Sequence, residues 1–122
     1  SEAVGYAAVS TAIALNADCI ITPTFYGQTA RLIAHFRPKM PIYGVSPHDR
    51  AMRRMQLYWG VYPYKGMMEE SSTKIMRNSL KVLKEKGKVK KDDLVVFTAG
   101  DAATNDVDGK SMTNMMNVVV VK

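Results

Sequence analysis

Short apolar runs alternate with helical segments along this chain of 122 residues, and the alternation limits the folds it can adopt. The predicted strands cover residues 18–23, 41–45, 60–64, 94–98 and 115–121, and the predicted helices cover residues 1–16, 27–36, 47–58 and 73–86. Strands that alternate with helices favour a parallel sheet with both faces covered. We therefore expect an α/β protein with a three-layer αβα fold, a mostly parallel five-stranded sheet and helices on both faces.

The continuous apolar run Leu94–Phe97 is typical of a strand that is buried on both faces. With 47% hydrophobic residues, the chain can bury a core of its own. Residues 1–122 are therefore expected to form a single domain. The segment 1–16 is helical in pattern from its first residue, without a capping segment before it, so we expect the chain to be a fragment of a longer protein.

Capping residues mark the ends of two of the predicted helices. Ser46 suits the N-cap of the third predicted helix, with Pro47 at its first position. Ser71, Ser72 or Thr73 caps the fourth predicted helix, and Gly87 suits the position just after its end. That helix has an apolar stripe of Met76, Leu80 and Leu83, and its lysine-rich opposite face is interpreted as a solvated surface.

Positive charge is concentrated in the middle of the chain. The sequence has 17 Lys and Arg against 11 Asp and Glu, and fifteen of the basic residues lie between Arg31 and Lys91. This balance is compatible with phosphates, nucleic acid or an acidic partner, but it specifies none of them. Asp101, Asp106 and Asp108 make the stretch that follows acidic.

Cys19 is the only cysteine, so no internal disulfide can form and a reducing compartment is expected. Because it lies mid-strand without a local base, we interpret it as an inert core residue. The sequence shows no signal peptide and no apolar run long enough to span a bilayer. We therefore expect a cytoplasmic protein without a membrane partner.

Three loops are expected at the carboxyl ends of the strands, where ligands bind in open α/β sheets. They are residues 24–29, 46–49 and 99–113. The first joins a strand to a helix N-terminus, which favours an anion, and Thr24 and Thr29 add hydroxyl groups. The alternative is a purely structural turn in which Thr24 caps the helix and Gly27 relieves backbone strain.

The other candidate residues give weaker signals. The carboxylates in the loop 99–113 could hold a metal ion, but their spacing favours an exposed loop, and we predict no metal site. No Ser/His/Asp or Cys/His set is recognisable, so we predict no catalytic residue in this chain. An aromatic group around the third strand indicates core or interface packing, with base stacking as the alternative: Tyr58, Trp59, Tyr62 and Tyr64.

Five segments in order resemble the C-terminal domain of pyruvate kinase, and they extend over essentially the whole chain. They are residues 7–12, 24–31, 37–42, 59–63, and Thr98–Gly100 with Thr113–Asn114. The resemblance implies that the parent enzyme transfers a phosphoryl group from phosphoenolpyruvate to ADP. It implies Mg²⁺ and K⁺ in a separate barrel domain and no cofactor in this one.

The resemblance also implies a regulatory and oligomerisation role. The implied partners are the rest of the pyruvate kinase chain, the other subunits of a homotetramer, and a phosphorylated small-molecule effector. Thr24, Gly27 and Thr29 match the family's effector phosphate loop. Phe25 and Tyr26 depart from its pattern, and the acidic residues after Gly100 would repel a bisphosphate. We therefore expect weak or no binding of fructose 1,6-bisphosphate.

Two alternatives stay open at this point. One is a stand-alone small-molecule phosphate sensor with the same fold, which would begin natively near Ser1. The other is a nucleic-acid-binding module, which only the positive charge suggests and which we do not expect.

Overall fold

A computed structural model describes residues 2–67, 71–99 and 115–122. Within these residues, five strands form one sheet: β1 (Cys19–Pro23), β2 (Ile42–Ser46), β3 (Val61–Lys65), β4 (Leu94–Ala99) and β5 (Met115–Val120). The helices are α1 (Glu2–Leu15), α2 (Gln28–His35), α3 (Asp49–Met55) and α4 (Ser72–Glu85). The strand order is β3-β2-β1-β4-β5, and only β5 runs antiparallel to its neighbour. The expected mostly parallel five-stranded sheet is confirmed.

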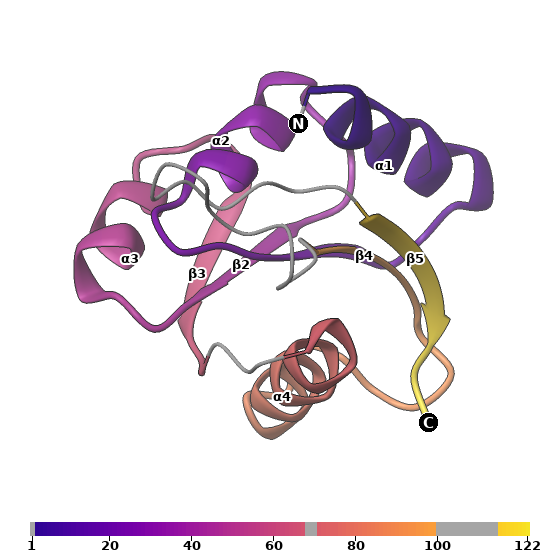
Figure 1. Cartoon of the computed structure of the whole chain (residues 1–122). Coiled ribbons are helices and arrows are strands. Elements are labelled where there is room, and N and C mark those ends of the chain that lie inside the picture. Colours follow the sequence, from indigo (N-terminus) through magenta and orange to yellow (C-terminus); the bar gives the residue numbers. More distant parts are fainter. Residues whose placement is uncertain (1, 68–70, 100–114) are drawn as a thin grey trace.

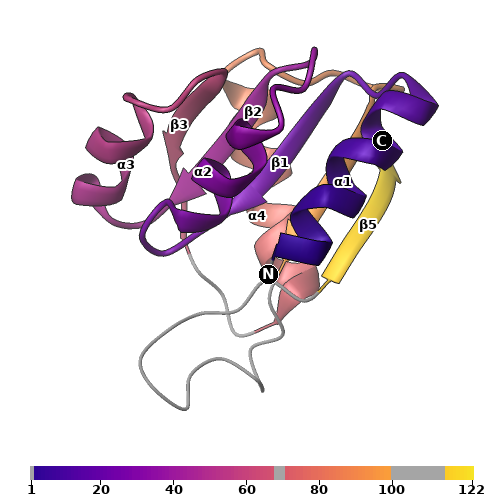
Figure 2. The same cartoon turned by 90° about the horizontal axis from the view of Figure 1, so that it is seen from above.

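The helices cover the two faces of the sheet unequally. Figure 1 shows α1, α2 and α3 on one face and α4 alone on the other, and Figure 2 shows the first three side by side over the strands. Each face has its own core: Ile20, Ile42 and Val96 pack with the first three helices, whereas Ile21, Val45 and Phe97 pack with α4. The three-layer αβα arrangement is therefore confirmed, with three helices on one face and one on the other.

The central strand β1 explains why both faces must be covered. All five of its residues are buried, and Cys19, Ile20 and Ile21 alternate between the two cores. β1 pairs in parallel with β2 on one side and with β4 on the other. At its start, the Asp18 backbone N–H donates to the Leu94 carbonyl (2.8 Å) and the Leu94 N–H donates to the Asp18 carboxylate (2.8 Å). These bonds fix the register of two segments that are far apart in the sequence.

The expected start and end of the third helix are wrong. Ser46 is the last residue of β2, where it pairs with Lys65, and His48 is the N-cap of α3. Parallel pairing keeps Ser46 extended, so the helix begins at Asp49, two residues later than expected. Its end also comes earlier than Tyr58, because the Tyr58 N–H donates to the Met55 carbonyl (3.1 Å) in a tighter turn than that of an α-helix.

The ends of α4 agree with its sequence signals. The Ser71 hydroxyl accepts a hydrogen bond from the Lys74 N–H (3.2 Å) at the N-cap. Gly87 has a φ of 72°, its N–H donates to Lys84 (3.1 Å), and the Lys88 N–H donates to Leu83 (2.9 Å). These two bonds define a Schellman motif, which satisfies the last carbonyl groups of the helix.

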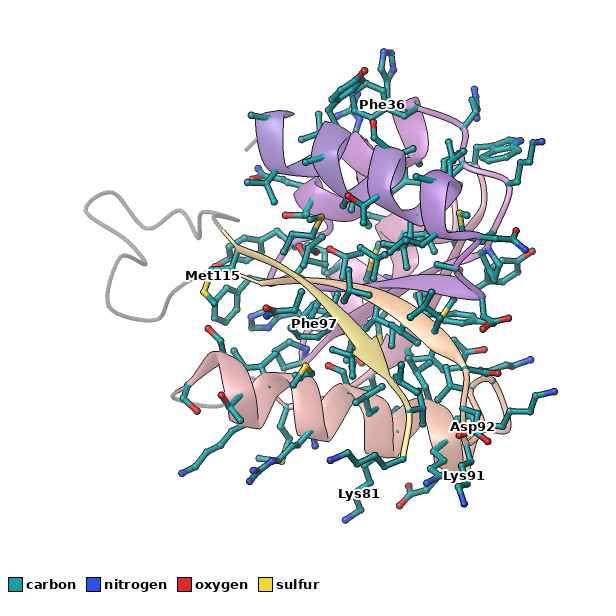
Figure 3. All side chains as sticks on the ribbon, turned by 90° about the vertical axis from the view of Figure 1, so that its right-hand side faces the viewer. Phe36, Lys81, Lys91, Asp92, Phe97 and Met115 are labelled. Carbon is teal, nitrogen blue, oxygen red and sulfur yellow. The ribbon has the colours of Figure 1, made fainter. Side chains whose placement is uncertain are left out.

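The buried face of α4 differs slightly from the expected stripe. Ile75, Ser79 and Leu83 are buried, whereas Met76 and Leu80 are only partly buried. Its basic residues lie on the far side, and Figure 3 shows Lys81 pointing away from the sheet. The interpretation of that face as a solvated surface is confirmed.

Gly44 in β2 leaves room for Met55 of α3. A Cβ atom at Gly44 would lie 2.3 Å from the Met55 sulfur, and Met55 is fully buried. The thioether therefore occupies the space where another residue would carry its side chain. This close approach seats α3 on the sheet directly beneath the loops at its carboxyl edge.

The Gly44–Met55 contact predicts that substitutions at the two residues have non-additive effects on stability. We expect Gly44→Ala to lower the free energy of unfolding by about 1–3 kcal/mol through overpacking, and Met55→Ala to lower it by about 2–5 kcal/mol through a cavity. The double variant should lose less than the sum, because the added methyl group then fills part of the cavity. Urea unfolding of the four proteins measures the coupling, and additive losses would contradict this packing.

Candidate functional site

The loop that follows β1 lies at the carboxyl edge of the sheet, as expected. The Thr24 backbone N–H donates to the Val45 carbonyl (2.9 Å), which continues the pairing of β1 with β2 by one residue. Thr24 is buried, and the next residues turn toward α2. The beginning of the loop is therefore held by the sheet itself.

Thr24 and Gly27 determine the shape of the loop. The Thr24 hydroxyl accepts a hydrogen bond from the Gly27 N–H (3.0 Å), and Gly27 has a φ of 89°. A Cβ atom at Gly27 would lie 3.1 Å from Cγ of Met55. The prediction that Gly27 relieves backbone strain is confirmed. The predicted cap is wrong in detail, because Gly27 is the N-cap of α2 and the Thr24 hydroxyl binds the residue before the helix starts.

Ser46 joins the first two predicted loops. Its hydroxyl donates to the Phe25 carbonyl (3.1 Å) and accepts from the His48 N–H (3.1 Å). Ser46 is fully buried, so one side chain satisfies two backbone groups at the carboxyl edge. Sequence reasoning assigned Ser46 to a helix cap and missed this bridge. The available signal was its position at the end of the apolar run that forms β2, at the carboxyl edge where β1 also ends.

Aromatic rings gather beside this bridge. The rings of Tyr26 and His48 are stacked, with centroids 5.6 Å apart and an interplanar angle of 3°. Phe25 lies 6.1 Å from His48, between centroids. Tyr26 and His48 are both exposed, so the stack forms part of the surface next to the N-terminus of α2. Sequence reasoning noted Phe25 and Tyr26 as unusual for the loop but did not pair either of them with His48.

The site therefore combines the N-terminus of α2 with a preceding loop that is held by hydrogen bonds of Thr24 and Ser46. The N–H groups in the first turn of a helix have no acceptor within the helix, and the helix dipole favours an anion there. Thr29, the second residue of α2, is half-buried and contributes a hydroxyl to this first turn. The three residues predicted as a phosphate loop, Thr24, Gly27 and Thr29, thus lie on one short segment, where Thr24 and Gly27 have structural contacts of their own.

The residues that the structure describes bring no reactive groups together at this edge. Burial, with smaller effects of Asp93 and Asp18, raises the pKa of the Cys19 thiol to about 12, so it stays protonated at neutral pH. The interpretation of Cys19 as a buried core residue is confirmed. Among the described residues, no three His, Cys, Asp or Glu side chains come together as metal ligands. The candidate carboxylates Asp101, Asp106 and Asp108 lie outside the described residues.

One further property follows from the helices. In the part of the chain that the structure describes, none of them has the length and apolar character that crossing a membrane requires.

The fold and the loop define an α/β domain with a strand-to-helix turn of the kind that binds anions. A model of the pyruvate kinase alpha/beta domain matches residues 2–119. The chain therefore belongs to the pyruvate kinase family, as its C-terminal alpha/beta domain. The resemblance inferred from the sequence motifs is confirmed.

Individual relatives agree with this assignment. The chain is 35% identical to the pyruvate kinase of Bacillus licheniformis over 121 residues, which is 99% of this chain and 20% of the relative. It is 35% identical to that of Clostridium acetobutylicum over 122 residues, which is 100% of this chain and 25% of the relative. It is 34% identical to that of Geobacillus stearothermophilus over 121 residues, or 20% of that protein. The chain thus spans between a fifth and a quarter of the length of these relatives.

Alanine substitutions at two glycines test whether the loop packs against α3. Gly27 and Gly60 have similar φ values, 89° and 70°, but only Gly27 would place a Cβ against a neighbour, since nothing lies within 4 Å at Gly60. We expect Gly60→Ala to cost about 1 kcal/mol of stability through backbone strain alone. Gly27→Ala should cost about 1 kcal/mol more, because Met55 must also move. Thermal and urea unfolding measure the difference, and equal losses would show that the loop is not packed against α3 as described.

Proposed function

We propose that this chain is the non-catalytic regulatory and oligomerisation domain of a pyruvate kinase. Its family membership and its span of between a fifth and a quarter of the relatives' length support the proposal. In the parent enzyme, phosphoryl transfer from phosphoenolpyruvate to ADP takes place in a separate barrel domain, which would use Mg²⁺ and K⁺. The proposed partners are the rest of that chain and the other subunits of a homotetramer, and the proposed location is the cytoplasm.

The regulatory part of the proposal rests on the loop at the N-terminus of α2. The Thr24 hydroxyl and the positive φ of Gly27 hold the backbone so that the first turn of α2 faces the carboxyl edge of the sheet. A phosphate group of an effector would bind the N–H groups of this turn and the hydroxyl of Thr29. Thr24 then has a positioning role, since its hydroxyl already accepts from Gly27.

The aromatic stack argues for an effector other than fructose 1,6-bisphosphate. Tyr26 and His48 present rings beside the loop, and rings offer less to a small, highly charged sugar bisphosphate than polar side chains would. A monophosphorylated effector needs only one anion subsite, which the N-terminus of α2 provides.

A thermal-shift screen tests effector binding. Sugar phosphates, AMP, ATP and amino acids are compared with the unliganded protein. We expect one phosphorylated compound to raise the melting temperature by several degrees, since saturation at about 100 times the dissociation constant adds roughly 2.7 kcal/mol of stability. Fructose 1,6-bisphosphate should give a smaller shift.

Substitution of one hydroxyl supplies the control. Thr29→Val should remove most of the shift, whereas Thr73→Val, at an exposed position in the first turn of α4, should leave it unchanged. A shift that survives Thr29→Val would refute the assignment of the loop. A large shift with fructose 1,6-bisphosphate that Thr29→Val abolishes would refute the preference for another effector.

The oligomerisation part rests on the surface formed by β5 and α1. β5 is an edge strand without a charged residue, and its Val118 and Val120 are 44% and 54% exposed. In Figures 2 and 3, α1 lies beside β5, and its Tyr6 and Ile13 are exposed as well. An uncharged edge strand readily pairs with another strand. Two copies could therefore join their β5 edges about a two-fold axis, with the apolar side chains buried between them.

Charge at this edge should prevent the association. We expect the chain to self-associate, and Val118→Lys combined with Val120→Lys to weaken the association about tenfold or more, since each lysine would be desolvated at the contact. Leu57→Lys is the matched control, because Leu57 is 85% exposed in the turn after α3, away from β5. Sedimentation equilibrium over a range of concentrations gives the dissociation constants. A monomeric wild-type chain, or equal effects of all the lysine substitutions, would rule out the β5 interface.

A further inference from the structure

The amino ends of β2 and β3 border a cavity that the proposed function does not use. It has a volume of about 640 Å³ and lies at the opposite edge of the sheet from the Thr24 loop. Four aromatic rings and two basic side chains contribute to its walls: Tyr43, Trp59, Tyr62, Tyr64, Lys39 and Lys88. A cavity of this volume is of the size that binds small molecules in proteins.

The cavity follows from the unequal covering of the sheet. Of the described elements, only α4 covers this face, and its buried residues pack on the core of Ile21, Val45 and Phe97. Tyr43 of β2 belongs to the same core and Tyr64 of β3 packs against it, whereas Tyr62 of β3 is exposed. Gly87 then turns the chain at the end of α4, so that Lys88 reaches the cavity. The cavity is thus bounded by regular elements and by a defined helix end.

Its aromatic walls have a fixed geometry. Tyr43 pairs with Tyr62 across β2 and β3, with ring centroids 6.2 Å apart, and meets Tyr64 edge-to-face at 5.8 Å. Tyr62 and Trp59 are about half exposed, at 53% and 50%. Arg37 lies 5.0 Å from the centre of the Trp59 ring and holds it in place. Tyr62 and Trp59 therefore present exposed ring surface against which a planar ligand can pack.

Tyr43 adds an unused polar group to this wall. It is nine-tenths buried, with a relative exposure of 9%, and the described residues supply no hydrogen-bond partner for its hydroxyl. Burial raises the pKa of this phenol, so the hydroxyl stays protonated and can donate. Because Tyr43 lines the cavity, its hydroxyl can donate a hydrogen bond to a ligand atom there.

The charged residues that line the cavity are all basic, although Asp93 lies near enough to act on the Tyr43 phenol. Lys39 and Lys88 are exposed in its walls, and Arg37 lies against the adjoining Trp59. No carboxylate is among the described residues that line it, and the one ion pair found in the described part of the chain is Lys65–Asp49, outside the cavity. A ligand with an anionic group would be attracted here.

We propose that this cavity binds a small ligand that combines a planar aromatic ring with an anionic group, either phosphate or carboxylate. The ring stacks on Tyr62 and Trp59, the anion lies between Lys39 and Lys88, and Tyr43 donates a hydrogen bond to the ligand. The site is separate from the Thr24 loop, so it stands or falls independently of the proposed effector site.

Four probe compounds test separately whether the site requires an aromatic ring and an anionic group in its ligand. AMP joins a ring to a phosphate and phenylacetate joins a ring to a carboxylate, whereas adenosine has only the ring system and ribose 5-phosphate only the anion. Trp59 is the single tryptophan, so the NMR signal of its indole N–H reports on the cavity directly. Calorimetry gives the dissociation constants. We expect AMP or phenylacetate to shift this signal and to bind about tenfold more tightly than adenosine and ribose 5-phosphate.

Variants assign the binding to this cavity. Tyr62→Ala and Lys88→Gln change exposed side chains, and each should weaken the binding roughly fivefold. Two controls should leave it unchanged: Lys81→Gln on the outer face of α4, and Arg31→Gln in a second cavity that also borders Trp59. Melting curves check that every variant is folded.

Three results would overturn the proposal. The first is no indole shift with either AMP or phenylacetate at millimolar concentration. The second is equal binding of ribose 5-phosphate and AMP, which would show a simple anion site. The third is unchanged affinity in both Tyr62→Ala and Lys88→Gln. If the Thr24 loop binds no effector but these probes behave as expected, only the proposed regulatory function is lost.

Discussion

Complete burial of β1 is the constraint from which the other features of this domain follow. Because β1 is paired on both sides and covered on both faces, helices must lie above and below the sheet. Three helices lie on one face and one on the other. They cover the central strand completely, but they cover the outer strands unequally on the two faces. The carboxyl edge then carries the loop before α2, and the less covered face of β2 and β3 carries the aromatic cavity. Both candidate sites thus lie at the margins of a single packed centre.

The order of elements was predictable because it depends on local patterns. Continuous apolar runs such as Leu94–Phe97 and the breaks at Pro38 and Pro41 punctuate the chain clearly. Gly87 was predictable as a helix end for the same reason, since its signal lies within a few residues. The role of Ser46 was not, because a serine before a proline suits a helix cap equally well. Its hydroxyl binds Phe25, 21 residues earlier, and only the pairing of β1 with β2 makes that contact possible.

In the candidate sites as well, local features were predictable from the sequence and contacts between distant segments were not. Thr24, Gly27 and Thr29 could be selected from the sequence, because a strand-to-helix turn is a local feature. The stacked rings of Tyr26 and His48 come from the segments that follow β1 and β2, and the rings of Tyr43 and Tyr62 come from the neighbouring strands β2 and β3. Such pairs need a strand register, which one sequence does not supply. The sequence grouped Trp59, Tyr62 and Tyr64 around one strand, but Tyr43 and Lys88 join that group only through the sheet and the turn after α4.

The pairing of β1 with β4 has a consequence for the order of folding. Asp18 and Leu94 are separated by 76 positions, so this half of the central ladder closes only when most of the chain is present. Until then, β1 can pair with β2, and β2 with β3, but the other edge of β1 stays open and apolar. Contacts between distant segments slow folding, and an open apolar edge invites association with other chains. During synthesis, the domain would therefore carry its greatest risk of misassembly just before β4 emerges from the ribosome.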